Sequence, residues 1–386
     1  MKANAIIILK SIIFRFQVLI YYVASVISKF YYPSEKKPLL IIGMETSNLL
    51  KLYSKIFKAF SINTNNNPSY SNKYNLDISR FPLAFQPLIL AVIFPFLIKK
   101  FDSFWYLSRG SFFISNDGRL WEFSILKKHN TQIGTFFLGD DIRSIILSRE
   151  NAKSLNFDHH SFYLDQNIDN RMIKINDQKS KQYSHAADIH SDHIFSLSVD
   201  QISHIKRPVY AVPMPVQRNR FEFNISKWDA VEKINILHCP SYPVLKGTPL
   251  INAAIKKLQI EGYDFNFTML TGVPHAEVLR ALDKSHIVLN QFYCFAPGMF
   301  GIEALEANCL LFNSASREIE PSLFEGSDEA WVVTYYWQIY DNLKFYLDNF
   351  HLAQAKANIG TTWAKTYCSH ESVKSYVESI MNIKKI

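Results

Sequence analysis

The chain has 386 residues, of which 48% are hydrophobic and 20% are charged. This length and balance are typical of a folded protein of two domains, and they exclude a disordered chain. Its four cysteines form no C-x-x-C pair and no disulfide framework, which indicates a reducing compartment. The net charge of +8 is concentrated in the first 40 residues, which hold six basic side chains and one acidic one. The rest carries too little excess charge for a nucleic-acid-binding surface, so no nucleic-acid partner is expected.

The chain opens with an apolar segment over residues 5–28, which Lys10 and Arg15 interrupt. These charges leave no apolar run long enough to span a membrane. On a helix, the segment carries apolar residues on one face at spacings of three and four. That face holds Ile12, Ile13, Phe16, Leu19, Ile20, Val23 and Ile27, and the other side holds Lys10, Gln17, Ser25, Ser28 and Lys29.

Residues 1–37 are therefore expected to form an amphipathic N-terminal extension, for which two interpretations stay open. The helix either lies in the plane of a membrane interface, with basic residues toward anionic headgroups, or docks on the protein's own surface. The first interpretation predicts a peripheral membrane contact through residues 5–28. A cleaved signal peptide is disfavoured, because Arg15 breaks its apolar core.

A second apolar stretch, residues 81–98, contains no charged side chain. By length alone it qualifies as a membrane span. Pro82, Pro87 and Pro95 instead favour a proline-interrupted helix that is buried against a sheet or lies against a bilayer.

Beyond residue 37, short apolar runs alternate with amphipathic segments, which is typical of βα units and parallel sheets. The expected strands are 38–42, 103–107, 131–138, 193–196 and 209–212, then 234–238, 265–270, 286–290, 310–313 and 331–334. The expected helices include 47–60, 120–129, 249–258, 275–284, 300–308 and 371–383. A polar, proline-containing stretch after residue 213 is typical of a linker. We predict an α/β fold of two doubly wound Rossmann-like domains, 38–220 and 221–386, which face each other across a cleft.

Several familiar sites are missing from the sequence. There is no G-x-G-x-x-G, no P-loop and no G-x-S-x-G motif. The His185–His193 region collects histidines and aspartates, but His185 and His190 are five positions apart and do not share a helix face. Solvated loop residues explain this region better than a metal site, so no metal is expected.

Two short motifs follow predicted strands, where open α/β sheets bind ligands. Gly139-Asp140-Asp141-Ile142-Arg143 places paired carboxylates and an arginine after the first of these strands, although Asp140 could also cap a helix and Arg143 pair with Asp141. Lys246-Gly247-Thr248 places a lysine beside a helix N-terminus, which suits a diphosphate, although such pairs are also common on surfaces.

A third motif runs from Ala296 to Leu305 and combines a Pro-Gly loop with the start of a helix. The backbone N–H groups of residues 298–301 would point into the cleft, toward phosphate or sugar oxygens. Glu303, in the first helical turn, could accept hydrogen bonds from ribose hydroxyls or simply favour the helix N-terminus.

The spacing of the last two motifs, together with Val273-Pro274-His275-Ala276-Glu277-Val278, resembles the donor-nucleotide domain of retaining GT-B ("group 1") glycosyltransferases. The amino-terminal half resembles them more faintly, through the 139–143 motif and Val212-Pro213-Met214-Pro215-Val216. The resemblance implies a divergent member of the bacterial polysaccharide-locus type, with 38–220 on the acceptor side and 221–386 binding the nucleotide-sugar. It covers most of residues 38–386.

Carried over residue by residue, the resemblance implies that Lys246 holds the donor diphosphate and Glu303 the ribose or nucleoside. It assigns catalytic roles to Asp141 and Arg143, and donor binding to Lys246, Gly247, Gly298, Met299, Phe300, Gly301 and Glu303. The sequence also departs from the family. The first of two family glutamates is Phe295 here, an arginine before the lysine is lost around Pro243, and a family histidine is Leu138.

The implied function is metal-independent, retaining transfer of a sugar from a nucleotide-sugar to a saccharide or lipid-linked saccharide, in bacterial surface polysaccharide synthesis. No cofactor is expected, because the nucleotide-sugar is a co-substrate. The implied place is the cytoplasm or the inner face of the cytoplasmic membrane. The departures at Phe295 and Pro243 keep an alternative open, in which a catalytically degenerate GT-B protein binds a nucleotide-sugar or a partner glycosyltransferase.

Overall fold

The computed structural model describes residues 2–65, 67, 72–114, 116–162, 170–229 and 231–381. The strands are β1 (Lys37–Gly43), β2 (Phe60–Asn63), β3 (Leu76–Asp77), β4 (Phe101–Leu107), β5 (Gln132–Phe136), β6 (His193–Phe195), β7 (Ile234–His238), β8 (Phe265–Met269), β9 (Ile287–Leu289), β10 (Leu310–Asn313) and β11 (Val332–Val333). The helices are α1 (Lys2–Ser28), α2 (Leu49–Ile56), α3 (Gln86–Lys100), α4 (Leu120–Lys128), α5 (Ile145–Ser154), α6 (Asn170–His190), α7 (Ile225–Trp228), α8 (Thr248–Ile260), α9 (His275–Lys284), α10 (Gly298–Glu306), α11 (Ser327–Ala330), α12 (Ile339–Asp348), α13 (His351–Cys368) and α14 (His370–Met381).

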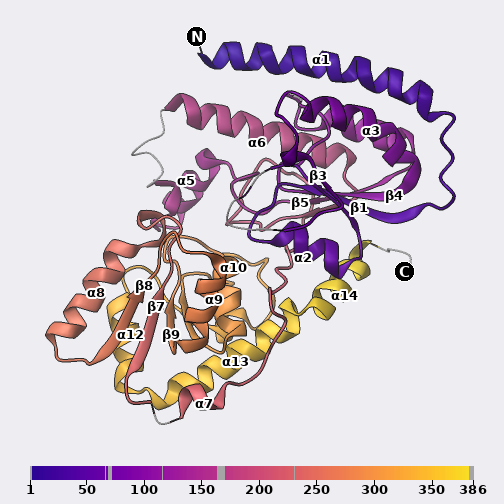
Figure 1. Ribbon diagram of the computed structural model, residues 1–386. Coiled ribbons are helices and arrows are strands. Elements are labelled where there is room, and N and C mark those ends of the chain that lie inside the picture. The colour runs from indigo at the N-terminus through magenta and orange to yellow at the C-terminus, as the bar shows by residue number, and fades with distance from the viewer. Residues whose placement is uncertain are drawn as a thin grey trace.

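The strands form two separate parallel sheets, one in each half of the chain (Figure 1). The first has the order β3-β2-β1-β4-β5-β6, and the second has the order β11-β10-β9-β7-β8. The direction of winding therefore reverses between β1 and β4 in the first sheet and between β7 and β9 in the second. Such reversal points open a crevice at the carboxyl ends of the strands, where doubly wound sheets bind ligands.

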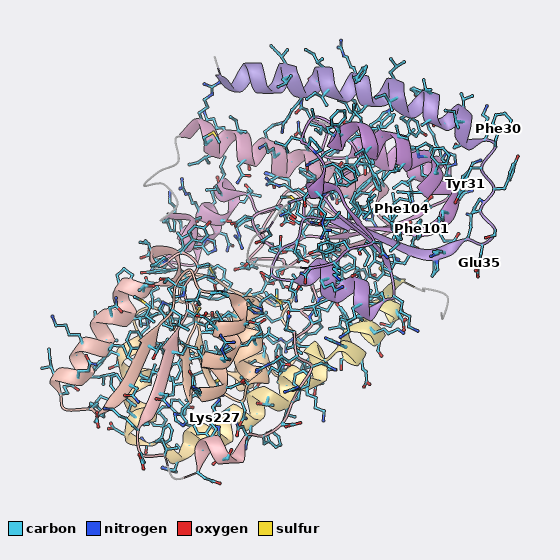
Figure 2. The ribbon with its side chains drawn as sticks, viewed as in Figure 1. Phe30, Tyr31, Glu35, Phe101, Phe104 and Lys227 are labelled. Atoms are coloured by element: carbon cyan, nitrogen blue, oxygen red, sulfur yellow. The ribbon has the colours of Figure 1, made fainter. Side chains whose placement is uncertain are left out.

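The first sheet is covered by helices on both faces. One face packs Leu40, Ile42 and Phe104 against Ala91 and Phe94 of α3, so the proline-interrupted helix predicted over 81–98 is buried against the sheet. The other face packs against α2 and α14. Figure 2 shows Phe101 and Phe104 within this domain.

Three expectations for the first half were wrong. The helix predicted over 47–60 ends at Ile56, and β2 follows it from Phe60. β2 and β3 were not predicted, because strands of four and two residues have no periodicity to distinguish them from turns. Residues 209–212 form only one bridge, between Tyr210 and Phe195, instead of a strand.

The second sheet matches the sequence prediction strand for strand. β7, β10 and α9 have the predicted bounds, and the other predicted strands differ by one or two residues at an end. The central strands β9 and β10 are fully buried and almost entirely apolar, as parallel sheets require where helices cover both faces. β8 lies at the edge of the sheet and is exposed over much of its length.

The chain crosses between the domains twice. It first passes through the stretch after Pro213, and it returns where α13 gives way to α14 (Figure 1). The two crossings touch, because the backbone N–H of Val216 donates to the carbonyl of Cys368 over 3.1 Å. α14 then packs Val373, Val377 and Met381 on the first sheet. The closing helices assigned to 221–386 are thus not all in the second domain, although the predicted domain boundaries themselves stay a prediction.

α1 lies across the outside of the first domain, over α3 (Figure 1). Its inward side carries Gln17 and Tyr21, both buried. The Gln17 amide donates to the carbonyls of Pro87 and Phe112 over 2.9 and 3.0 Å, and its oxygen accepts from the N–H of Ile114 over 2.8 Å. Gln17 and Ser28 of the expected polar side therefore face the protein, while most of the expected apolar face points outward. Ile20 is an exception, because it packs on the core of the first domain, and Lys29 is exposed.

Over Ile8–Ser28, α1 is long and apolar enough to cross a membrane by length and composition alone, as some buried core helices and N-terminal signal sequences also are. α1 docks on the protein's own surface, against α3, while its outward apolar side chains stay exposed, so a peripheral membrane contact stays a prediction. At the end of α1, Phe30 is 82% exposed (Figure 2).

Replacing Gln17 tests whether these hydrogen bonds hold α1 in place. Gln17→Leu leaves two carbonyls and one N–H without a partner in a buried position, so we expect a loss of about 1–3 kcal/mol in the free energy of unfolding. The exposed Leu19→Gln control should change it by less than about 0.5 kcal/mol. Urea denaturation followed by tryptophan fluorescence measures both, and equal midpoints would contradict the assignment.

Candidate active site

A cavity of about 460 Å³ lies between the two domains, at the reversal points of both sheets. Thr46, Ser47 and Ser108 reach it from the loops after β1 and β4. Ser241, Lys246 and Gln291 reach it from the loops after β7 and β9. The remaining lining residues are Leu138, Gly139, Asp140, Asp141, Arg143, Leu197, Asp200, Gln201, Met214, Tyr242, Leu245, Cys294, Ala296 and Gly298. This cavity is the cleft site, built from both domains.

On the wall of the cleft site formed by the first domain, the Asp141 side chain forms hydrogen bonds within its own loop. Its carboxylate accepts from the backbone N–H of Leu138 at 3.0 Å and of Gly139 at 2.8 Å. Burial raises the pKa of the Asp141 carboxyl, and these N–H groups oppose the rise. Asp141 therefore shapes the 138–143 turn at the edge of the cleft site.

Arg143 joins the two domains through Asp200. Its Nη2 lies 2.7 Å from the Asp200 carboxylate, and it also pairs with Asp140. The other Asp200 oxygen accepts from the backbone N–H of Phe295, 2.8 Å away in the second domain. Burial opposes ionisation of Asp200, but the charge of Arg143 prevails and lowers the pKa of that carboxyl.

Phe295, at the position where the resemblance implies a glutamate, packs in an aromatic cluster. Its ring stacks on His159 at a centroid distance of 5.1 Å and meets Phe157 at the same distance. Burial, followed by the charge of Arg143, lowers the pKa of His159 to about 4. This imidazole is therefore neutral at physiological pH, and Phe295 is held by contacts between rings.

Glu320 of the second domain fastens the loop after β6. Its fully buried carboxylate accepts from the backbone N–H groups of Val199 and Asp200 over 2.7 and 2.6 Å. It also accepts from the N–H and the hydroxyl of Ser198, over 3.2 and 2.7 Å. These four hydrogen bonds cross the domain junction beside the cleft site.

On the second-domain wall, Lys246 ends the short 3₁₀ turn Val244–Lys246 directly before α8. Gly247 follows in the left-handed region, with φ of 82°, which favours glycine and turns the chain into the helix. The Lys246 ammonium donates to the side-chain oxygen of Gln291. A cation and a helix N-terminus thus meet at one side of the cleft site, which suits a phosphate group.

The loop before α10 reaches the cleft site through Ala296, and α10 reaches it through its first residue, Gly298. Gly298 lines the cavity, and its φ of 62° again lies in the left-handed region. Gly301 is needed for close packing, because a Cβ there would lie 2.7 Å from the Asn290 amide nitrogen. That amide donates to the carbonyl of Pro297 over 2.7 Å and so holds the loop ahead of the helix.

Glu303 is a buried residue of α10. One carboxylate oxygen lies 2.9 Å from Nε2 of His275, the first residue of α9. The hydrogen bond to Glu303 raises the pKa of His275. Burial, with the added charge of Glu303, also raises the pKa of Cys239 to about 11, which places the glutamate near the loop that leads to Lys246.

Of the predicted site residues, the structure brings Asp141, Arg143, Lys246 and Gly298 together on the cleft site. Gly247, Met299, Phe300, Gly301 and Glu303 lie next to these residues in the chain but do not line it. The roles assigned to all nine stay predictions. Sequence reasoning missed Asp200, Gln201 and Gln291, although Gln291 directly follows a predicted strand and could have been found by that position.

Among the described residues, no group of three or more histidines, cysteines, aspartates or glutamates is arranged to hold a metal ion. In the 185–193 region, Asp188 accepts from the backbone N–H of Lys206 over 3.0 Å, and Asp192 pairs with Lys127 at 2.7 Å. Both carboxylates therefore fasten neighbouring segments to the first domain.

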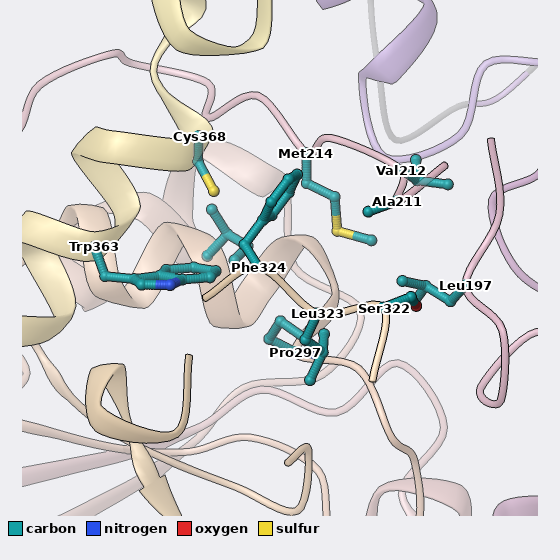
Figure 3. A pocket seen from close by; sticks show the side chains of 11 residues that line it. Leu197, Ala211, Val212, Met214, Pro297, Ser322, Leu323, Phe324, Trp363 and Cys368 are labelled. Atoms are coloured by element: carbon teal, nitrogen blue, oxygen red, sulfur yellow. The ribbon is translucent and has the colours of Figure 1, made fainter. Parts of the chain in front are cut away.

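A second, apolar cavity lies behind the cleft site, at the domain junction (Figure 3). It measures about 30 Å³, which is far too small for a nucleotide-sugar. Met214 and Cys368 border it, one from each crossing of the chain, and Trp363 closes one side. Apolar packing thus supports the place where the crossings touch.

Glu320→Gln tests the junction between the domains. An amide NH₂ would face the donors that the carboxylate now accepts from, so we expect a destabilisation of about 1–3 kcal/mol and faster hydrogen exchange at 198–200. Exchange measured by mass spectrometry checks this. Glu318→Gln, at an exposed neighbouring glutamate, should leave exchange unchanged, and equal rates in both variants would contradict the role.

The His275–Glu303 pair predicts a pH dependence. Because the pKa of His275 is raised above its usual 6.5, the pair stabilises the fold fully below that pH. The stabilisation is lost as the pH rises through the folded pKa. An NMR titration of His275 should give a value above 6.5, and Glu303→Gln should lower it. A titration unaffected by Glu303→Gln would rule out the pairing.

No family model matches the chain, and no curated protein matches its sequence. Solved structures do resemble it. Sucrose-phosphate synthase from Thermosynechococcus elongatus is 10% identical, with a TM-score of 0.56, over 90% of this chain and 98% of that chain. The S. aureus MnaA–UDP co-structure is 13% identical, with a TM-score of 0.48, over 90% and 98%. A glycosyltransferase from Rickettsia africae ESF-5 is 12% identical, with a TM-score of 0.46, over 91% and 99%.

The likeness to the synthase covers 90% of this chain, so it is not confined to one of the two sheets. At this identity it shows a shared architecture, and the two reversal points at the cleft agree with it. The chain therefore has the GT-B fold, with two doubly wound Rossmann-like domains facing across a cleft and an amphipathic helix at the N-terminus.

Proposed function

We propose that this protein is a glycosyltransferase that moves a sugar from a nucleotide-sugar to a saccharide or lipid-linked saccharide. The observation that carries the proposal is the cleft site itself. It places a lysine, a helix N-terminus and a glycine loop of one domain opposite a polar loop of the other, at both reversal points. A donor and an acceptor can be held against each other in such a site.

The donor binds to the second domain in this proposal. Lys246 and the backbone N–H groups at the start of α10, from Gly298 to Gly301, hold the diphosphate. Met299 and Phe300 shape this loop, and Gly247 lets the lysine approach. Glu303, oriented by His275, accepts hydrogen bonds from the ribose hydroxyls.

In the transfer step, the bond between the anomeric carbon and the diphosphate oxygen breaks. The acceptor hydroxyl oxygen forms the new bond to that carbon, and its proton leaves with the nucleoside diphosphate. Lys246 and the helix N–H groups stabilise the charge that develops on the leaving group, without a metal. We propose retention of configuration, with Arg143 and the turn held by Asp141 positioning the acceptor.

We propose a role in bacterial surface polysaccharide synthesis at the inner face of the cytoplasmic membrane. Support comes from α1, whose outward face is apolar and whose sequence contains no acidic residue. A helix of this kind suits a peripheral contact with an anionic membrane surface.

A degenerate protein that binds a nucleotide-sugar or a partner glycosyltransferase without catalysis is the second candidate. The specific observation in its favour is that the family glutamate is replaced by Phe295, which packs on His159. Asp141 and Arg143 are also engaged by backbone N–H groups and by Asp200.

Donor binding and transfer distinguish the two candidates. We expect one class among UDP-, GDP-, ADP- and CMP-sugars to raise the melting temperature, and Lys246→Ala to abolish the shift. Transfer to an acceptor panel should fall about 10²–10³-fold in Lys246→Ala, because the leaving diphosphate loses its cation.

The exposed Lys256→Ala on α8 is the matched control and should behave as the unaltered protein. Donor binding without transfer to any acceptor would favour the degenerate candidate. Absence of any donor-dependent shift would overturn the proposal as a whole.

A further inference from the structure

The outward side of α1 forms a continuous apolar surface, which we name the outer face. Its nine large side chains are each between 53% and 60% exposed, and they are Ile8, Leu9, Ile12, Phe16, Leu19, Tyr22, Val23, Val26 and Ile27. The surface extends past the end of the helix to Phe30 and Tyr32. Exposed apolar surface of this extent marks an interaction site.

The charges on this segment favour a lipid surface as the occupant. α1 carries basic residues and no acidic one, and Arg15 is exposed among the apolar side chains. Lys29 is exposed at the end of the helix, and Lys36 and Lys37 follow it. A basic, apolar helix held parallel to the domain surface is suited to the headgroup region of an anionic bilayer.

Beneath the N-terminal half of α1 lies a cavity of about 330 Å³, which we name the under-helix cavity. Leu83, 82% exposed, stands at its edge on the turn before α3. Its floor is apolar and includes Leu90, Phe112 and Phe113. Such walls suit the first part of a hydrocarbon chain that enters from the side of the bilayer.

Two cations line this cavity and a third lies beside it. Lys10 and Arg109 are lining residues. Lys179 is on the same face of α6 as Asn176, which accepts from Arg109 over 3.2 Å, and Tyr183, which lines the cavity. Burial, and then the charges of Lys10 and Arg109, lower the pKa of Lys179. Among the described residues, none of the three lies within ion-pair distance of a carboxylate. Like charges kept together in this way favour the binding of an anion.

The under-helix cavity is connected to the cleft site through Arg109. Its Nε donates to the carbonyl of Asp141 over 2.8 Å, and its Nη2 donates to that of Asp140 over 3.0 Å. Both aspartates line the cleft site, and so does Ser108, the neighbour of Arg109 in the chain. One loop therefore separates the two cavities.

We propose that the outer face seats on an anionic bilayer and that the under-helix cavity binds the phosphate of a lipid acceptor. Lys10, Arg109 and Lys179 hold the phosphate, while the lipid chain passes Leu83 toward the membrane. The group to be glycosylated then extends past Arg109 into the cleft site. This inference names the acceptor class of the proposed transfer reaction and rests on that function.

Vesicle binding tests the proposal without any transfer reaction. The probes are phosphatidylcholine vesicles that contain a minor fraction of either polyprenyl phosphate or phosphatidylserine, matched in charge. Lys10→Gln/Lys179→Gln is compared with Lys29→Gln/Lys37→Gln, which removes the same charge from exposed positions. We expect both double variants to lose affinity equally on phosphatidylserine, and only the first to lose a further tenfold or so on polyprenyl phosphate.

The outer face is tested by Phe16→Ser/Leu19→Ser/Val23→Ser, which should abolish binding to all vesicles. If both lysine double variants lose the same affinity for vesicles of either lipid, the lipid-phosphate site is overturned. An alternative result is that free inorganic pyrophosphate raises the melting temperature, with Lys10→Gln/Lys179→Gln removing the shift and the vesicles showing no preference for polyprenyl phosphate. That result would make the under-helix cavity a site for soluble phosphate and would overturn the lipid acceptor. If light scattering shows that the unaltered protein is a stable dimer and binds no vesicles, and the serine variant is a monomer, the outer face is a dimer interface. That result would overturn the proposal that the outer face binds a bilayer.

Failure here is distinguishable from failure of the proposed function. Lys10→Gln/Lys179→Gln should keep the donor-dependent melting shift, because neither lysine lines the cleft site. If the unaltered protein binds no donor but still prefers polyprenyl phosphate to phosphatidylserine, the proposed transfer reaction is contradicted and the lipid-phosphate site stands. If it binds a donor but shows no such preference, the lipid-phosphate site is contradicted and the proposed transfer reaction stands.

Discussion

Two buried carboxylates accept hydrogen bonds from backbone N–H groups across the domain junction, and these bonds fix the two domains relative to each other. Glu320 reaches from the second domain to the loop after β6, and Asp200 of that loop reaches back to the N–H of Phe295. A carboxylate accepts several hydrogen bonds at once, and in a buried place each is costly to break. The cleft site exists in this geometry because these two side chains fix one wall against the other.

On both walls of the cleft site, the predicted site residues are already engaged by neighbouring groups. Asp141 shapes a turn, Arg143 is fixed by Asp200, and the Lys246 ammonium already contacts Gln291. Few groups are left to act as acid, base or nucleophile. This suits a reaction whose main requirement is to hold two substrates and stabilise a departing diphosphate.

The sequence predicts features that depend on neighbouring residues, and it does not predict features that depend on contacts between distant segments. β7 and α9 are predicted to the residue because their pattern is local, whereas β2 depends on its pairing with β1 and β3. Lys246 and Gly298 could be found on loops after strands, but Glu320 lies on no recognisable motif and acquires its role only across the junction. The periodicity of α1 predicts a helix with two faces. It does not say which face is inward, because that depends on carbonyls from distant loops that Gln17 satisfies.

The paired crossings at Val216 and Cys368 have a mechanical consequence. A domain tethered by a single strand can swivel and twist about it, but two tethers bonded side by side resist both motions. The remaining low-energy movement is a swing about one axis through the paired segments. Opening the cleft about this axis would break the hydrogen bonds between Glu320 and the loop after β6. Opening of the cleft site and release of this buried carboxylate are in this way the same event.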